Sequence, residues 1–277
     1  MSTEQLAEFF GLQGKVAVVT GGGGVLCGTL SRGLARMGVA VAVLDISARA
    51  AQAVAHDITE AGGTALALTC DVLNRASIEA AATQVGSALG RADILVNGAG
   101  GNDPRATTTA ERPFFDLEPE AVSRVFSLNF TGTFLASQVF AHAMARQGEG
   151  VILNVSSMNA LRPLTRIPAY SAAKAAVSNF TQWLAVHMAQ EYSPRIRVNA
   201  IAPGFFLTDQ NRYLLTHEDT GQLTPRGQTI LEHTPMRRFG DPEDLVGTLL
   251  WLVSGATSFV TGVVVPVDGG FSAYAGV

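Results

Sequence analysis

The chain has 277 residues, of which 47% are hydrophobic and 15% are charged, with a mean hydropathy of +0.25. This composition supplies enough apolar side chain for a large core and excludes an intrinsically disordered protein. The net charge of −4 and the pI near 5.7, with lysines and arginines scattered along the chain, exclude the basic surface that nucleic-acid binding requires. We predict a single domain spanning residues 1–277.

No stretch approaches the ~18 to 20 consecutive apolar residues that a membrane span needs, so we expect no membrane partner. Residues 1–15 contain Glu4 and Glu8 and have no basic end before an apolar block, unlike a signal peptide, so we expect a cytoplasmic location. Cys27 and Cys70 are too few for a disulfide framework, and the five histidines show no metal-ligand spacing. We therefore expect buried, reduced thiols and no metal site.

Apolar runs of strand length alternate with longer segments of helical period. The predicted strands are Val16–Thr20, Val39–Asp45, Thr64–Thr69, Asp93–Asn97, Val151–Ser156, Arg195–Ala202 and Val263–Val267. Because these runs are apolar along their length, both faces of the sheet should be covered, as in a parallel sheet.

The predicted helices lie between these strands. They are Leu26–Met37, Ala48–Ala61, Ser77–Leu89, Pro119–Ala145, Tyr170–Glu191 and Pro242–Val253. The first four carry the alanine-rich apolar stripe of a helix that packs on a sheet. Strict alternation of strand and helix predicts an α/β fold, a Rossmann-type doubly wound, seven-stranded parallel sheet with helices on both faces.

Two polar segments punctuated by proline and glycine interrupt the alternation. Gly98–Leu117 follows the fourth predicted strand and Leu207–Asp241 follows the sixth. Loops of this length are usually functional, and in a parallel sheet they leave the carboxyl ends of strands, where ligands bind. We predict substrate loops near residues 101–117 and 207–241.

Four consecutive glycines, residues 21–24, follow the first strand and open a helix. A turn without side chains lets a pyrophosphate approach backbone N–H groups at a helix N-terminus, although a tight turn with positive φ would also need glycine. Asp45 ends the second strand, about 20 residues further on, where a carboxylate binds the adenosine ribose and repels a 2′-phosphate. We therefore favour NAD over NADP. Alternatively, Asp45 caps the following helix, a role that Ser47 could fill instead.

Polar or small residues also end the next two strands. Asp71, after the third strand, could bind the adenine amino group, and Asn97–Gly100, after the fourth, would allow close backbone approach. Each could instead be an ordinary strand-to-helix cap. Their occurrence at successive strand ends favours a dinucleotide site at that edge of the sheet.

Tyr170 and Lys174 begin a predicted helix four residues apart, which places both on one face. An ammonium about 4 Å from a phenol supplies about 4 kcal/mol before desolvation, and each unit of pKa lowering needs about 1.4 kcal/mol. We therefore expect Lys174 to lower the pKa of Tyr170 toward neutrality, where a tyrosine acts as general acid or base. Ser157, at the end of the fifth strand, can donate to a substrate oxygen.

These motifs resemble the short-chain dehydrogenase/reductase family over essentially the whole chain. Further matches are Asn129 in the long crossover, Pro203-Gly204 and Thr208 after the sixth strand, and Val-Asp-Gly-Gly at 267–270. The resemblance implies that Tyr170 is the acid/base, that Ser157 orients and polarises the carbonyl, and that Lys174 binds the nicotinamide ribose. It also implies that Asn129 helps to hold a proton-relay water and that Thr208 meets the nicotinamide phosphate or carboxamide.

The family turn usually reads Thr-Gly-x-x-x-Gly-x-Gly, and counting from Thr20 places Val25 and Cys27 at the second and third glycine positions. Either the helix begins differently, with Gly24 or Gly28 in those roles, or the pyrophosphate lies farther out. The expected cofactor-binding residues are Gly21, Gly23, Gly24, Val25, Leu26, Asp45, Asp71, Val72, Asn97, Gly98, Ala99, Tyr170, Lys174, Pro203, Gly204, Phe206 and Thr208.

A narrower resemblance is to the branch described as D-mannonate oxidoreductases, or fructuronate reductases. Its residues here are 21–26, 97–102, 202–208, 235–240 and 268–274, and the branch shares the four glycines followed by Val-Leu. It implies NAD(H)-dependent interconversion of D-fructuronate and D-mannonate. Another polyol, sugar or 3-oxoacyl substrate, and a non-catalytic dinucleotide-binding regulator, remain alternatives.

A hexuronate needs amide donors and at least one cation in its site. The candidates are Asn102, Asn159, Arg162, Arg166, Asn211 and Arg212. Phe205 and Phe206 either wall the nicotinamide pocket or fill the core. The two long predicted helices Pro119–Ala145 and Tyr170–Glu191 resemble those that pack between subunits in family tetramers, and the apolar tail Phe271–Val277 suits a subunit contact, so we expect a homotetramer.

Overall fold

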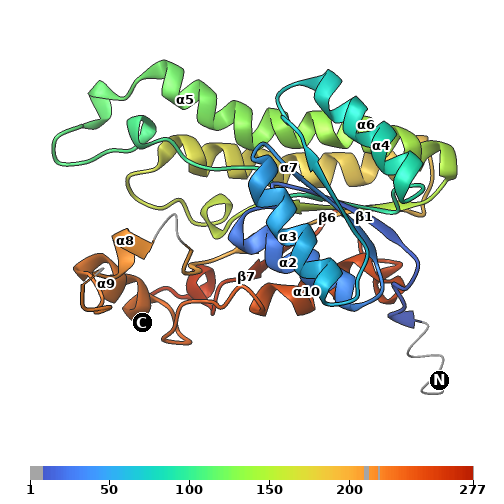
Figure 1. Ribbon diagram of the computed structural model, residues 1–277. Helices are drawn as coiled ribbons and strands as arrows, with labels where there is room; N and C mark the ends of the chain where they lie inside the picture. The colour runs from blue at the N-terminus through green and yellow to red at the C-terminus, as the bar shows by residue number, and fades with distance from the viewer. Residues whose placement is uncertain (1–8, 209–211, 218, 277) are drawn as a thin grey trace.

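The computed structural model describes residues 9–208, 212–217 and 219–276, and within them seven parallel strands form one sheet in the order β3-β2-β1-β4-β5-β6-β7 (Figure 1). The strands are β1 (Val16–Thr20), β2 (Ala40–Asp45), β3 (Ala65–Thr69), β4 (Ile94–Asn97), β5 (Gly150–Val155), β6 (Ile196–Pro203) and β7 (Val264–Val267). Each ends within one residue of its predicted bounds. The predicted doubly wound fold is confirmed, with its switch point between β1 and β4.

The strand register aligns the residues that end the central strands. Thr20 at the end of β1 pairs with Leu44 of β2 on one side and with Asn97 of β4 on the other. Asn97 in turn pairs with Asn154 of β5. The segments that follow β1, β2, β4 and β5 therefore emerge at one edge of the sheet, so residues far apart in the sequence meet there.

The helices cover both faces of the sheet (Figure 1). They are α2 (Val25–Arg36), α3 (Ala48–Glu60), α4 (Arg75–Ala88), α5 (Pro119–Phe126), α6 (Gly132–Gln147), α7 (Pro168–Glu191), α8 (Arg212–Leu215), α9 (Pro225–His233) and α10 (Asp244–Val253). Among the helices in the described residues, none is both long and apolar enough to cross a membrane.

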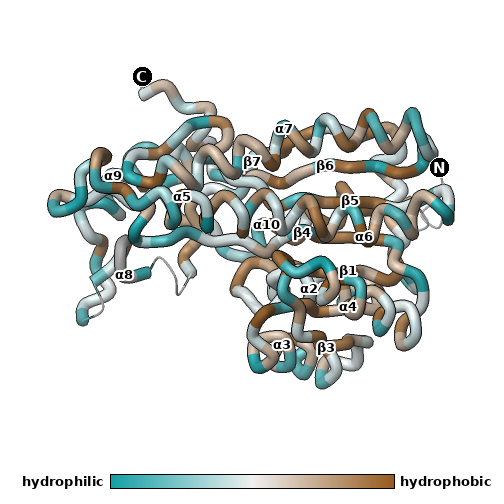
Figure 2. The backbone as a smooth tube through the Cα atoms, turned by 90° about the horizontal axis from the view of Figure 1, so that it is seen from above, coloured by the Kyte–Doolittle hydropathy of each residue, from teal (hydrophilic) through white to brown (hydrophobic). Residues whose placement is uncertain are grey.

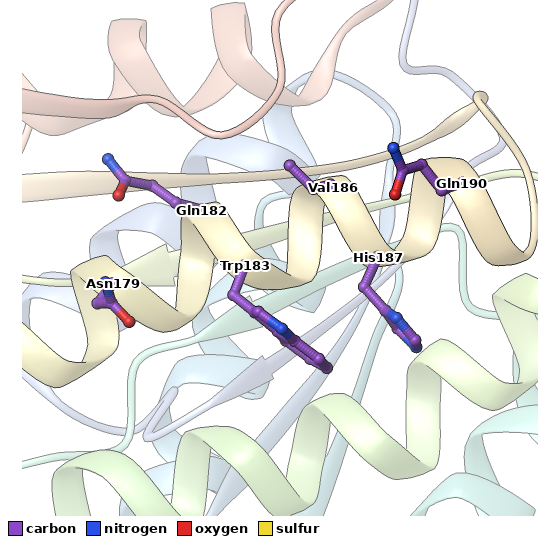
Figure 3. Close-up of a pocket in the computed structure, with 6 residues that line it drawn as sticks. All are labelled: Asn179, Gln182, Trp183, Val186, His187 and Gln190. Carbon is purple, nitrogen blue, oxygen red and sulfur yellow. The ribbon is translucent and has the colours of Figure 1, made fainter.

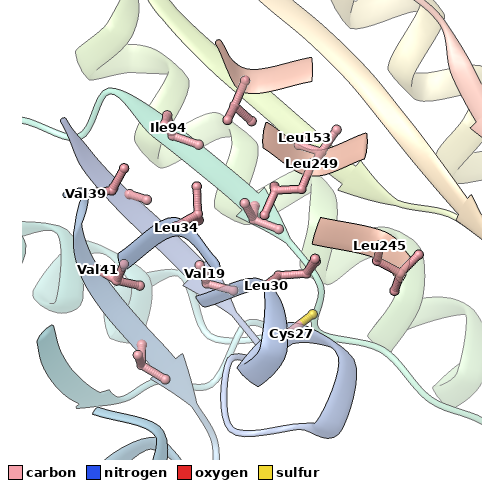
Figure 4. Packing of buried hydrophobic residues seen from close by; sticks show 14 of the residues in the cluster. Val19, Cys27, Leu30, Leu34, Val39, Val41, Ile94, Leu153, Leu245 and Leu249 are labelled. Atoms are coloured by element: carbon pink, nitrogen blue, oxygen red, sulfur yellow. The ribbon is translucent and has the colours of Figure 1, made fainter. Parts of the chain in front are cut away.

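Successive strand residues point into two separate hydrophobic cores. Val19 packs with α2, α3 and α10, whereas its neighbour Val18 packs with α4, α6 and α7. Figure 4 shows the first of these cores, with Leu30 of α2 and Leu249 of α10 against the strands. This alternation explains why the strands are apolar throughout, since both of their faces are buried.

The long helix predicted over Pro119–Ala145 is interrupted. Between α5 and α6 lies one π-helical turn, Ser127–Thr131, and Asn129 at its centre is fully buried. The hydroxyl of Thr133 donates to the Asn129 carbonyl at 2.9 Å. Apolar periodicity does not reveal such a turn, because the hydrophobic stripe continues through it; π turns of this kind are frequent at functional sites.

The segment after β6 contains α9, which the sequence analysis missed. Its nine residues are few and mostly polar. Thr224 caps it by accepting a hydrogen bond from the Gly227 N–H, and Pro225 occupies its first turn, a local signal that could have revealed it. Figure 2 shows many hydrophilic residues around α8 and α9, whereas β5 and β6 are largely hydrophobic.

Candidate active site

The glycine turn after β1 brings two backbone segments into direct contact. Gly21 has φ +64°, and a Cβ on it would lie 2.8 Å from the backbone of Ala99. Gly24 is the N-cap of α2, and it provides no side chain to cap the helix. The helices after the next two strands differ, because Ser47 caps α3 and Asn74 caps α4. The N-terminus of α2 therefore keeps N–H groups that can bind a phosphate.

Val25 and Cys27, which stand at glycine positions of the family turn, both lie in the first turn of α2. The helix begins at Val25 with Gly24 as its cap. A Cβ on Gly28 would lie 3.1 Å from the Val54 side chain, so Gly28 permits close packing of α2 on α3. Cys27 is buried, and this burial raises the pKa of its thiol to about 12. Cys27 is therefore a neutral packing residue, not a reactive thiol.

Asp45 lies beside the glycine turn and does not cap α3. Its carboxylate accepts hydrogen bonds from the Gly23 N–H at 3.0 Å and from the Ser47 N–H at 2.9 Å. Ser47 itself provides the cap of α3, so the alternative interpretation of Asp45 as the helix cap is wrong. The position fits a carboxylate that binds ribose hydroxyls next to the pyrophosphate turn.

The segments after β3 and β4 complete this edge of the sheet. Asp71 accepts a hydrogen bond from the Leu73 N–H at 2.9 Å. Val72 contacts the start of α6, where a Cβ on Gly132 would lie 2.8 Å from its side chain. The Thr20 hydroxyl accepts hydrogen bonds from the N–H groups of Gly98 and Ala99, which fixes the turn after β4 to β1.

The side chain of Asn97 points into the protein and not toward the open edge. Its amide donates to Ser137 and to Asn154, both at 2.9 Å, and Asn154 donates to Thr181 at 2.8 Å. This buried network joins β4 and β5 to α6 and α7. Only the backbone of Asn97 can face a cofactor. The sequence analysis missed Asn154, although a polar residue within an apolar strand was the available signal.

Asn129, Gly100 and Lys174 converge behind the turn after β4. Asn129 donates from Nδ2 to the Gly101 carbonyl at 2.7 Å and accepts at Oδ1 from the Gly101 N–H at 3.3 Å. A Cβ on Gly100 would lie 2.6 Å from Asn129 Oδ1 and 3.3 Å from Lys174 Nζ. The glycine therefore allows the amide and the ammonium to approach the same small volume.

Tyr170 and Lys174 lie together at the start of α7, as their spacing predicts. Lys174 Nζ lies 5.6 Å from the centroid of the Tyr170 ring and donates to the Val155 carbonyl at 2.8 Å. Burial lowers the pKa of Lys174 to about 8. Burial also raises the pKa of Tyr170, and a hydrogen bond with Ser157 offsets part of that rise.

The expected lowering of the pKa of Tyr170 by Lys174 is therefore not found in the structure. The physical reason is that the phenol and the ammonium are both removed from water, which disfavours the phenolate and the ammonium ion alike. In addition, the ammonium group of Lys174 donates a hydrogen bond to the Val155 carbonyl. The phenol is accordingly in its acid form at neutral pH, held by Ser157 on one side.

The segments after β6 and β7 pack against each other. The Gly204 N–H donates to the Val267 carbonyl at 3.0 Å, directly after Pro203. Phe206 is buried in the core beneath α10, so its ring fills the core and only its backbone can reach a cofactor. The centroid of the Phe205 ring lies 5.2 Å from that of Phe271. The Thr208 carbonyl accepts from the Arg212 N–H at 2.9 Å.

The predicted substrate residues are not all brought together. Asn102 donates to Thr107, and Arg162 donates to the Ser272 carbonyl at 3.1 Å, so both side chains already have partners in the protein. Asn159 and Arg166 line one pocket. Arg212 is an exposed residue of α8, and Asn211 lies outside the described residues. In the part of the chain that the structure describes, no three His, Cys, Asp or Glu side chains form a group that could hold a metal ion.

Comparisons with known proteins agree with this geometry. The family model for short chain dehydrogenase matches residues 15–219. The chain is 53% identical over 275 residues to an uncharacterized oxidoreductase, UxuB, of Bacillus subtilis (strain 168), covering 96% of this chain and 98% of the relative. It is 37% identical over 259 residues to the 7alpha-hydroxysteroid dehydrogenase of Escherichia coli (strain K12), covering 94% of each.

A solved structure is also similar. It is that of a protein from Haemophilus influenza provisionally named D-mannonate oxidoreductase, with bound NAD, which has 47% sequence identity and a TM-score of 0.91. The match covers 98% of this chain and 100% of that one. The resemblance stated from the motifs is thereby confirmed at the level of the family.

The contact at Gly100 yields a test of the site. Gly100→Ala should displace Asn129 Oδ1 or Lys174 Nζ and lower steady-state turnover about 10- to 100-fold, because small misplacements of catalytic groups are costly. Circular dichroism should show an unchanged fold. Gly86→Ala is the matched control, since a Cβ there meets nothing within 4 Å. Equal turnover in the two variants would show that the convergence at Gly100 has no catalytic role.

Proposed function

The chain belongs to the short-chain dehydrogenase family, whose members are oxidoreductases, and on this premise we propose that it interconverts D-fructuronate and D-mannonate with NAD(H). The observation that carries the chemistry is the partly buried Tyr170, with Ser157 and Lys174 as its neighbours. The observations that favour this substrate are the branch motifs and the 47% identity to the structure provisionally named D-mannonate oxidoreductase.

The residues around the glycine turn fit a dinucleotide. The uncapped N-terminus of α2 would bind the pyrophosphate, and Asp45 would bind the adenosine ribose and exclude a 2′-phosphate. Lys174 would bind the nicotinamide ribose. When bound, the dinucleotide supplies or accepts the hydride. The close contact of Gly21 with Ala99 leaves no room for a side chain at position 21 between the turns after β1 and β4.

In reduction, Ser157 donates a hydrogen bond to the keto oxygen and Tyr170 transfers its phenolic proton to that oxygen. The raised pKa of Tyr170 keeps the proton in place at neutral pH. In oxidation the phenol must first lose its proton, so this direction is favoured as the pH rises. Asn129 and Lys174, which approach each other at Gly100, would help to return a proton to the Tyr170 phenol after each reduction.

The substrate side is assigned to the segments near 101–117 and 207–241. The Thr108 N–H donates to the Arg166 carbonyl at 2.8 Å, which fixes the first segment to the loop before α7. The second segment carries α8 and α9, which lie together at the end of the molecule where the strands finish (Figure 1). In this proposal the content of these two loops sets the substrate.

A substrate panel tests the proposed reaction. Loss of NADH absorbance should be rapid with D-fructuronate and slow with neutral ketoses and with a 3-oxoacyl thioester. Tyr170→Phe should lower kcat about 100-fold or more, because it removes the proton donor, and leave NADH binding nearly unchanged. Preference for another panel member would replace the substrate assignment. Tight NADH binding without any turnover would indicate a dinucleotide-binding regulator.

Asp45 tests the cofactor assignment. Asp45→Ala should reduce the ratio of kcat/KM for NADH over NADPH about tenfold or more, because it removes the charge that repels a 2′-phosphate. Asp57→Ala is the control, since this carboxylate is exposed and pairs with Arg32 on the surface. If both variants keep the ratio of the unchanged protein, Asp45 does not contact the ribose.

We also propose that the exposed face of α7 packs against a second copy in a homotetramer. Trp183 and Val186 are each 56% exposed on this face. They line a groove of about 460 Å³ with Asn179, Gln182, His187 and Gln190 (Figure 3). An apolar helix face of this kind is normally covered by another protein surface.

Sedimentation velocity tests this assembly. The unchanged protein should sediment as a tetramer, and Val186→Glu should shift it to smaller species, because it places a charge in the apolar contact. Glu191→Gln, at the end of the same helix, is the control. A tetramer that persists in Val186→Glu would place the contact elsewhere, and a monomeric unchanged protein would refute the assembly.

A further inference from the structure

The loops at the carboxyl edge of the sheet carry several arginines, most of which are already bound within the protein. The bound ones are Arg105 and Arg124 on Asp103, Arg112 on the Pro104 carbonyl, Arg162 on the Ser272 carbonyl, Arg237 on the Glu232 carbonyl and Arg238 on Asp244. The guanidinium groups of Arg166 and Arg226 form neither a hydrogen bond nor an ion pair with any of the described residues. The guanidinium group of Arg212, which is exposed, forms none with them either.

Arg226 is in an unfavourable position for an unpaired cation. It is half-buried, and it lies in the first turn of α9, where the helix dipole disfavours positive charge. Burial lowers the pKa of Arg226, and the positive charge of Arg166 lowers it further. Arg166 and Arg226 belong to different segments, and neither guanidinium group has a partner among the described residues, so an anion bound by both would compensate their charges.

Arg166 is held in an unusual backbone conformation. Its φ is +77°, in the left-handed region that residues with a Cβ rarely adopt. The Arg166 carbonyl accepts the hydrogen bond from the Thr108 N–H described above, so the first substrate loop fixes this conformation. Strained residues of this kind cluster at functional sites, where the surrounding structure maintains them.

Arg166 also lines a pocket of about 550 Å³ together with Asn159 and Ser171. The Ser171 hydroxyl is buried and has no hydrogen-bond partner among the described residues. Asn159 lies two residues after Ser157, and its N–H donates to the Ser157 hydroxyl at 3.3 Å. The polar side chains of the pocket suit the hydroxyls of a sugar, and they stand among apolar ones such as Phe114 and Leu164.

We propose that Arg166 and Arg226 together bind the carboxylate of the sugar acid. The inference rests on the proposed function for the identity of the substrate. Planar guanidinium groups match a carboxylate by paired hydrogen bonds, and two of them from separate loops would select an acid over a neutral sugar. The same anion would compensate the two unpaired charges.

Steady-state kinetics test the pair directly. Arg166→Gln and Arg226→Gln should each raise the KM for D-fructuronate about tenfold or more and change kcat little, because binding that is equal in ground and transition states affects KM alone. Turnover of a neutral ketose should be unaffected. Arg226→Lys should recover part of the loss, which a merely structural role would not predict.

Arg237→Gln is the matched control. Arg237 is an exposed arginine of the same segment that donates to the Glu232 carbonyl, and its replacement removes the same charge. Its KM for D-fructuronate should equal that of the unchanged protein. An equal rise in KM in the control would mean that the effect is long-range electrostatics and would overturn the assignment.

Calorimetric titration of the NADH-bound protein with tartrate and with D-mannonate separates this inference from the proposed reaction. Both arginine variants should lose about tenfold or more in affinity for these carboxylates. If they do so although D-fructuronate is not reduced, the carboxylate site stands and the proposed reaction fails. If D-fructuronate is reduced and neither variant weakens carboxylate binding, the reaction stands and the arginine pair is refuted. Failure of the unchanged protein to bind either carboxylate also refutes the pair.

Discussion

Two turns lie in backbone contact at the switch point of the sheet, and the geometry of the site depends on this contact. The turn after β1 meets the turn after β4 where Gly21 faces Ala99, and any side chain at Gly98 would collide with Cys27. The Thr20 hydroxyl fixes the two turns to each other. On its far side, the turn after β4 carries Gly100 between Asn129 and Lys174. A single chain of contacts thus connects the glycine turn after β1 to the proposed proton-transfer group.

Burial governs the chemistry of that group. The phenol of Tyr170 and the ammonium of Lys174 are both desolvated, so each is shifted toward its neutral form. For the phenol, the hydrogen bond with Ser157 acts against this shift. The phenol of Tyr170 therefore keeps its proton at neutral pH.

How much of the structure could be predicted from the sequence depends on how far apart in the chain the interacting residues lie. Strands and most helices were predicted because burial on both sheet faces repeats along the chain, and Tyr170 with Lys174 because their contact lies within one helical turn. The π turn at Asn129 and the inward amide of Asn97 depend on packing between distant segments. The lowering of the tyrosine pKa was expected from charge alone, and the desolvation that outweighs it exists only in the folded protein.

The same reasoning explains why Arg226 was not among the predicted substrate residues. Most of its sequence neighbours are polar, and it belongs to a helix of only nine residues. What distinguishes it is the combination of partial burial, missing partners among the described residues and proximity to Arg166, which only folding creates. A parallel sheet with fixed catalytic groups can therefore change substrate by changing charges on loops that approach one another in space. Specificity of this kind leaves little trace in any single segment of the sequence.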